Sequence, residues 1–135
     1  MAKIFVVSGP VIVKNDKVLL TQHGVDNFWK FPGGRVENLE TEDLISVAKR
    51  EAREEVGAEI NIINPEPFLM NVVKDEEGEK IDVILVHYLA ELAPDEKVIM
   101  GANIRQVKWL EIANLETEPL APNILPVLKH FEFLK

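Results

Sequence analysis

The feature that most constrains this chain is a run of charges in one predicted helix, Arg50-Glu51-Ala52-Arg53-Glu54-Glu55-Val56-Gly57. The apolar residues of that helix recur every four positions and define the face that packs inward: Leu44, Ala48, Ala52 and Val56. At about 100° per residue, Glu55 falls inside this apolar stripe, and Glu51 and Glu54 flank it. The helix therefore places like charges at the edge of the protein core.

Carboxylates at the edge of a core need a compensating charge, because burying one is costly unless it is paired or bound to a metal. Hard divalent cations prefer oxygen ligands, so the cluster predicts a site for Mg²⁺, or for Mn²⁺ as a substitute. The alternative is an acidic helix whose glutamates are merely solvated. Gly33 and Gly34, just upstream, weigh against that alternative, since glycines let backbone groups approach a ligand closely.

The segment from Phe31 to Ala58 resembles the signature of the Nudix hydrolases, in which a glycine and then an acid precede an Arg-Glu-x-x-Glu-Glu-x-Gly core. That core matches without a gap from Arg50 to Gly57. The resemblance implies one domain over residues 1–135 with an α/β/α sandwich fold. In this fold a mixed, partly parallel sheet lies between the signature helix and a C-terminal helix. It also implies metal-dependent cleavage of the pyrophosphate linkage in a nucleoside diphosphate derivative.

One spacing departs from the signature and indicates a two-residue insertion. Glu40 has the family's interval from the second glycine, whereas Glu42 has its interval to Arg50. Either the loop is longer, with Glu42 as the motif acid and Asp43 as helix cap, or Thr41 caps a longer helix. We favour the longer loop, because it keeps the helix length of the family.

The resemblance also assigns roles within the predicted metal site. Glu54 and Glu55 are expected as principal ligands, with a backbone carbonyl from the glycine turn, Gly34 in particular, completing the set. Glu51 is expected as a third ligand or as the group that accepts the proton of the attacking water. Arg50 is expected to hold a carboxylate in place rather than to touch the substrate.

Three residues are candidates for substrate binding, each with a plainer alternative. Arg35 would meet a phosphate, or else be solvated at the surface. His23 stands near the end of the second predicted strand, where family members often carry a basic residue, or else is an exposed bystander. Asn123 resembles an asparagine that contacts the base in 8-oxo-dGTP-cleaving members, although it is one residue out of step. The favoured role for Asn123 is therefore a plain cap of the closing helix.

The acid that many Nudix enzymes carry about six residues before a tryptophan is replaced here by Asn103. The general base is therefore not assigned from the sequence, and Asp95 and Glu96 are the nearest substitutes. Trp29 and Phe31 are expected to pack the start of the helix against the sheet. His87 is expected to be a satisfied histidine at the edge of the core.

Alternating and apolar runs bounded by turn residues predict the remaining elements. The expected strands are residues 3–14, 17–23, 59–63, 68–74, 81–90 and 104–110, with a polar connection at 113–118 and a closing helix over 123–133. No apolar run is long enough to span a membrane, and the N-terminus does not read as a signal peptide. With no cysteine in the chain, a reducing cytoplasm is the expected location.

A net charge of −8 argues against long nucleic acids as partners, which leaves a small nucleotide as the expected partner of a monomer or homodimer. The favoured substrate is a nucleoside triphosphate, including oxidised forms, giving the monophosphate and pyrophosphate. The alternative is ADP-ribose or another nucleotide sugar, whose enzymes often carry an N-terminal dimerisation segment that this sequence does not show. A second alternative is a domain that senses nucleotides without cutting them.

Overall fold

The structure is a computed structural model that describes residues 3–135. Its strands are β1 (Lys3–Lys14), β2 (Lys17–His23), β3 (Gly34–Arg35), β4 (Ile60–Ile62), β5 (Phe68–Glu76), β6 (Glu79–Leu92) and β7 (Ile104–Glu111). The helices are α1 (Leu44–Val56), the 3₁₀ helix η1 (Ile112–Thr117) and α2 (Ile124–His130). The strands lie in the order β4-β6-β1-β2-β7, with β3 added to β1 and β5 added to β6.

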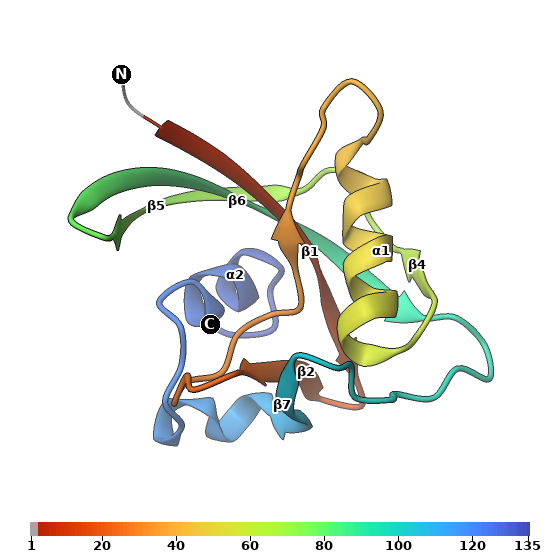
Figure 1. Ribbon diagram of the computed structural model, residues 1–135. Helices are drawn as coiled ribbons and strands as arrows, with labels where there is room; N and C mark the ends of the chain where they lie inside the picture. The colour runs from red at the N-terminus through yellow and green to blue at the C-terminus, as the bar shows by residue number, and fades with distance from the viewer. Residues whose placement is uncertain (1–2) are drawn as a thin grey trace.

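The long strand β1 joins the two parts of the sheet, as Figure 1 shows. It pairs in parallel with β6 from Lys3 opposite Ile81 to Ile12 opposite Ala90. Its far end pairs antiparallel with β2 through the turn Asn15-Asp16, where both residues have positive φ, 52° and 64°. The predicted mixed, partly parallel sheet is therefore confirmed.

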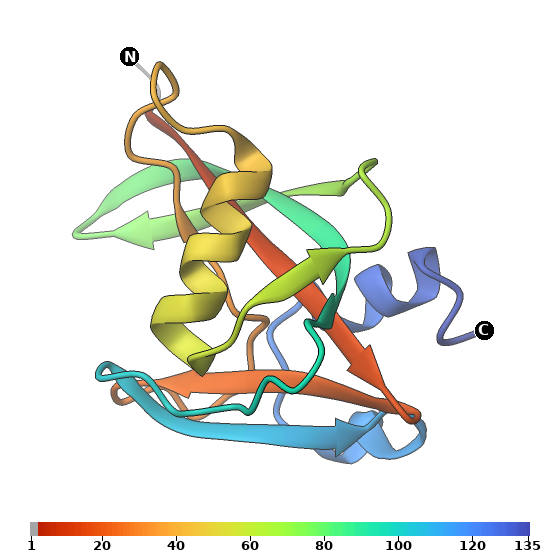
Figure 2. The same cartoon turned by 90° about the vertical axis from the view of Figure 1, so that its right-hand side faces the viewer.

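The two helices cover opposite faces of this sheet (Figures 1 and 2). Successive residues of a strand point to opposite faces, so β1 and β2 feed two cores. Ile12 and Leu19 pack with α1, whereas Val11 and Leu20 pack with α2. The same alternation along β6 turns Tyr88 toward α1. This arrangement confirms the predicted α/β/α class.

Both ends of α1 have specific capping residues. Asp43 is extended (φ −95°, ψ 165°) and its side chain accepts a hydrogen bond from the Ser46 amide at 2.7 Å. Gly57 ends the helix in the left-handed region at φ 64°, as a C-terminal glycine does. The longer-loop interpretation with Asp43 as cap is therefore confirmed, and the alternative cap at Thr41 is wrong.

Several boundaries differ from those expected. The charged tip between β5 and β6 is ordered as strand up to Glu76 and from Glu79, because the two-residue turn Glu77-Gly78 takes positive φ values of 52° and 82°. Helix α2 ends at His130 rather than at residue 133, and Glu132 has φ 68°, which a helix cannot continue through. Neither α-helix within residues 3–135 has the length and apolar character needed to cross a membrane.

Candidate active site

Glu55 joins helix α1 to the glycine turn that precedes it in the chain. Its residue surface is 7% exposed. The amide of Gly33 lies 3.4 Å and 3.3 Å from its two carboxylate oxygens, and Oε1 lies 3.1 Å from Nε2 of His23. The position of Glu55 inside the apolar stripe therefore gives its carboxylate backbone and side-chain hydrogen-bond partners, so that it is not buried among apolar side chains alone.

Glu51 lies against the second glycine of the turn. A Cβ atom built on Gly34 would come within 2.2 Å of Glu51 Oε1, so this close approach requires glycine. Burial, followed by the hydrogen bond and charge of Glu55, raises the pKa of Glu51 to about 7. Two carboxyl groups in such contact do not both ionise freely, so this pair requires a proton or a cation between its oxygens.

We expect Gly34→Ala to separate activity from stability. The added methyl group meets the flexible end of the Glu51 side chain rather than backbone, so the fold tolerates it while the carboxylate is displaced. A displacement of about 1 Å in a catalytic site costs about a hundredfold in rate. The measurements are kcat with Mg²⁺ and the melting temperature, and unchanged kcat would contradict the placement of Glu51. Gly24→Ala is the control: its φ of 45° strains the backbone and lowers the melting temperature, but nothing lies within 4 Å of the added methyl group, so kcat should be kept.

Glu54 lies on the solvent side of this pair. Its side chain is 59% exposed, and its Oε1 lies 3.8 Å from Arg50 Nε. Within residues 3–135 no three acidic or histidine side chains already converge as a cation site. The Glu51 and Glu55 oxygens, in contact and partly desolvated, nevertheless fit a hard divalent cation. Glu54 stands in the same turn of α1, on the open side of the pair.

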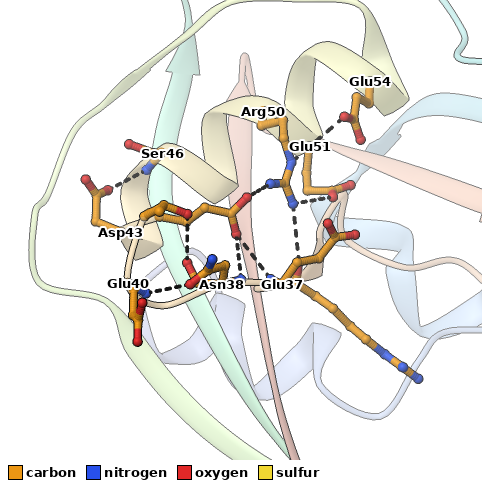
Figure 3. A network of polar contacts seen from close by, with 11 residues as sticks. Glu37, Asn38, Glu40, Asp43, Ser46, Arg50, Glu51 and Glu54 are labelled. Atoms are coloured by element: carbon orange, nitrogen blue, oxygen red, sulfur yellow. Dashed lines mark hydrogen bonds and ion pairs between the residues drawn. The ribbon is translucent and has the colours of Figure 1, made fainter.

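Arg50 is the centre of a polar network at the start of the site, drawn in Figure 3. Its guanidinium donates to the Glu42 carboxylate, and it lies 3.4 Å from Glu51 Oε1 and 3.3 Å from the Arg35 carbonyl oxygen. These contacts bind Arg50 to protein acceptors on three sides. The expected role of holding a carboxylate in place is consistent with this geometry.

Glu42 is the acid that ties the inserted loop to α1. Its Oε2 accepts hydrogen bonds from the amides of Glu37 and Asn38 at 3.1 Å and 3.4 Å, while its other oxygen meets Arg50. Glu40 instead turns outward, and only its backbone amide is held, by the Asn38 side chain at 2.9 Å. The structure therefore places Glu42 on the signature arginine, whereas Glu40 points away from Arg50 (Figure 3).

A cavity of about 490 Å³ opens beside the glycine turn. Its walls are largely apolar and aromatic, and its polar lining comes from two groups of side chains. Basic side chains line it at Lys30, Arg35 and Lys74, and neutral or titratable ones at His23, His87 and Asn123. A second, more open hollow of about 590 Å³ lies by Leu39 and Tyr88 at the start of α1 and does not reach Glu51 or Glu55.

The three candidate substrate-binding residues all line the cavity, but their contacts differ from those expected. Arg35 stacks on Phe5, with Cζ 3.9 Å from the ring centroid, and pairs with Glu76 at 3.4 Å. His23 contacts Glu55 and is therefore not an exposed bystander. Asn123 occupies the N-cap position of α2, yet its side chain makes no capping hydrogen bond, so the capping role is wrong.

Lys74 and His87 are cavity residues that the sequence did not single out for binding. His87 shares a face of its strand with Leu85, which also lines the cavity, and that alternation was the available signal. Trp29 and Phe31 are buried as expected, at 4% and 8% exposed, but they pack in the core on the α2 side of the sheet rather than against α1.

The possible substitutes for the missing acid have other surroundings than the glycine turn. Glu96 Oε1 accepts a hydrogen bond from the Glu59 amide at 2.6 Å, and Asp95 is exposed in a turn. Asn103 is exposed as well, two residues beyond Gly101, whose amide bonds the Glu55 carbonyl at 3.0 Å. The carboxyl groups next to the glycine turn are therefore those of Glu51 and Glu55.

Comparison with known proteins gives one consistent result. The family model described as NUDIX domain matches residues 5–131. An uncharacterised Nudix hydrolase of Bacillus subtilis, YvcI, is 28% identical over 118 residues, which is 86% of this chain and 72% of that protein. Nudix hydrolase 8 of Arabidopsis thaliana is 27% identical over 119 residues, 84% of this chain but only 31% of the plant protein. The crystal structure of a MutT protein from Bacillus halodurans superposes with a TM-score of 0.70 at 26% identity, covering 94% and 81% of the two chains.

Proposed function

The chain belongs to the Nudix family of hydrolases, and from this premise we propose that it converts a nucleoside triphosphate, including oxidised forms, to the monophosphate and pyrophosphate. The observation that carries the proposal is the cavity beside Gly33 and Gly34. It joins aromatic walls suited to a base, basic side chains suited to phosphates, and the glycine turn that Glu51 and Glu55 of α1 contact. Its volume of about 490 Å³ is in the range of small-ligand sites.

Nudix hydrolases act on nucleoside diphosphate derivatives and generally need divalent cations. We propose that Glu51, Glu54 and Glu55, with the Gly34 carbonyl, hold Mg²⁺ here, and that Mn²⁺ can replace it. Such a cation neutralises charge on the phosphate oxygens and makes water a better nucleophile. An acidic protein of net charge −8 needs that neutralisation to hold a polyphosphate.

The surrounding residues provide proton transfer, positioning of the carboxylates and phosphate binding. Glu51, which lies against the glycine turn, also accepts the proton of the attacking water. Arg50 fixes Glu51 and Glu42 without touching the substrate. Arg35, at the cavity wall beside Phe5, binds a phosphate oxygen. His23, at the end of β2, also binds the substrate. The family match over residues 5–131 supports the prediction of one domain.

The test is a panel of nucleotides incubated with Mg²⁺ or Mn²⁺, with products separated by chromatography. We expect pyrophosphate and a nucleoside monophosphate from at least one triphosphate. Release of AMP and a sugar phosphate from ADP-ribose, with triphosphates left intact, would contradict the proposal in favour of a nucleotide-sugar pyrophosphatase. A monomer or homodimer and a cytoplasmic location stay predictions.

A further inference from the structure

His87 is a buried histidine whose two ring nitrogens are both in use. The residue is 4% exposed, on the cavity face of β6. Nδ1 lies 3.0 Å from the Phe68 carbonyl oxygen, and Nε2 lies 2.9 Å from the amide nitrogen of Asn123. A carbonyl oxygen can only accept, so Nδ1 must carry a proton. In a neutral ring, Nε2 is then an acceptor.

The ring is neutral at physiological pH, because burial lowers the pKa of His87 to about 4. The Asn123 amide must therefore donate to Nε2, and the opposite amide orientation would set two acceptors against each other. The backbone carbonyl of Phe68 thus determines the orientation of the Asn123 side chain, through the fixed tautomer of His87. Phe31 packs edge-on against the same ring, with centroids 5.6 Å apart, which holds the ring in this position.

Holding the Asn123 amide in this orientation leaves its oxygen free to accept a hydrogen bond. Within residues 3–135 it has no hydrogen-bond partner, and it is not a buried unsatisfied atom. Since Asn123 lines the cavity and its NH₂ group is held by His87, Asn123 offers a ligand an acceptor. The aromatic walls at Phe28 and Phe31 suit a planar ring beside it.

We propose that His87 is a positioning residue that sets base preference, by holding the Asn123 carboxamide so that the cavity favours bases with an amino group over bases with a carbonyl group at the same position. This rests on the proposed function, in which the cavity receives the base. An amino group satisfies the Asn123 oxygen, whereas a carbonyl oxygen opposite it leaves both acceptors unpaired.

The experiment compares amino and oxo partners of otherwise matched nucleotides: ATP with ITP, and CTP with UTP. We expect the wild-type protein to favour the amino member by about tenfold in kcat/KM in at least one pair, mainly through KM, as one hydrogen bond of ordinary strength provides. His87→Leu should reduce that ratio to within about twofold. His87→Gln should restore it, because the glutamine oxygen can accept from the Asn123 amide.

His130→Leu is the matched control, since His130 stacks on Phe68 at 4.1 Å between centroids yet does not line the cavity. It should leave the amino-to-oxo ratio unchanged. If His87→Leu does not fold, Asn123→Leu, which removes the acceptor itself, should reduce the ratio in the same way. A wild-type protein without the preference, or a preference kept in a folded His87→Leu or Asn123→Leu variant, overturns the proposal.

Binding of the monophosphate pairs AMP and IMP, and CMP and UMP, measured by calorimetry without metal, separates this inference from the proposed function. A preference in binding without pyrophosphate release from any triphosphate would overturn the proposed function and support the role of His87. Pyrophosphate release without a preference in either measurement would support the proposed function and overturn the role of His87. Absence of both turnover and binding would overturn both.

Discussion

Glu54→Gln is expected to lower turnover with Mg²⁺ by more than about 10³-fold while leaving the fold intact. Glutamine keeps the size of the side chain but removes the negative charge that a hard cation requires. A general base alone contributes ~10²–10⁴-fold, and losing a cation ligand weakens both charge neutralisation and activation of the water. The 59% exposure of the Glu54 side chain predicts only a small change in melting temperature.

The matched control is Glu59→Gln. Glu59 is also an exposed glutamate close to an arginine, with Oε2 3.4 Å from Arg53 Nη1 and a side chain 53% exposed, but it follows the end of α1 and lies outside the Glu51–Glu55 turn of that helix. It should keep full turnover. Because the Glu54 side chain is exposed whereas Glu55 is buried, the Glu54→Gln variant tests directly whether Glu54 is a cation ligand.

Two results of the Glu54→Gln experiment would lead to different conclusions. Unchanged turnover with Mg²⁺ would remove Glu54 from the site and leave Glu51 and Glu55 as its carboxylates. Binding of nucleotides without turnover in the wild-type protein as well would instead favour a domain that senses nucleotides. Measuring binding and product formation on the same samples distinguishes these results.

The charged face of α1 could be predicted from the sequence because its signal is local. Helical periodicity alone placed Glu55 inside the apolar stripe, and the residue is 7% exposed in the structure. The residue following the helix, Gly57, and the acid before it, Asp43, have strong conformational preferences that fix the two ends. The family resemblance added the fold, because the signature implies the mixed sheet with a helix on each face.

The partner of Asn123 could not be predicted, because three separate segments create it. The register of β5 on β6 sets Phe68 opposite His87, and α2 must then dock with its first turn over the same ring. Local preference favoured a helix cap for Asn123, and the tertiary hydrogen bond to His87 replaced it. The choice between Glu40 and Glu42 was similar, since only the folded loop shows which acid reaches Arg50.

His87 should also make the folded state sensitive to acid. Its pKa falls from an ordinary 6.5 to about 4 in the folded protein, because burial disfavours the charged ring more than the Phe68 carbonyl stabilises it. Between these two values the unfolded chain binds more protons than the folded one, so the free energy of unfolding rises with pH. The contribution is complete above pH 6.5 and is lost as the pH falls toward 4.

The expected loss is about 3 kcal/mol, since each unit of pKa difference corresponds to about 1.4 kcal/mol. Urea unfolding at several pH values from 7.5 to 4 measures it, with His87→Gln as the comparison. On acidification the wild type should lose about 3 kcal/mol more than the variant, which has no histidine at this position to titrate. Taking the difference removes the titration of Glu51, which is common to both proteins.

His130→Gln provides the control for this pH experiment, because His130 is an exposed histidine at the end of α2. Any pH-dependent change that His87→Gln shows and His130→Gln does not is then assigned to His87. Parallel curves for the wild type and His87→Gln would mean that the folded protein does not lower the pKa of His87 below its ordinary value of 6.5. The tautomer would then fix the Asn123 amide only above that pH, because a protonated Nε2 donates and would attract the amide oxygen instead. The acid titration therefore tests the premise on which the proposed base preference depends, without using any nucleotide.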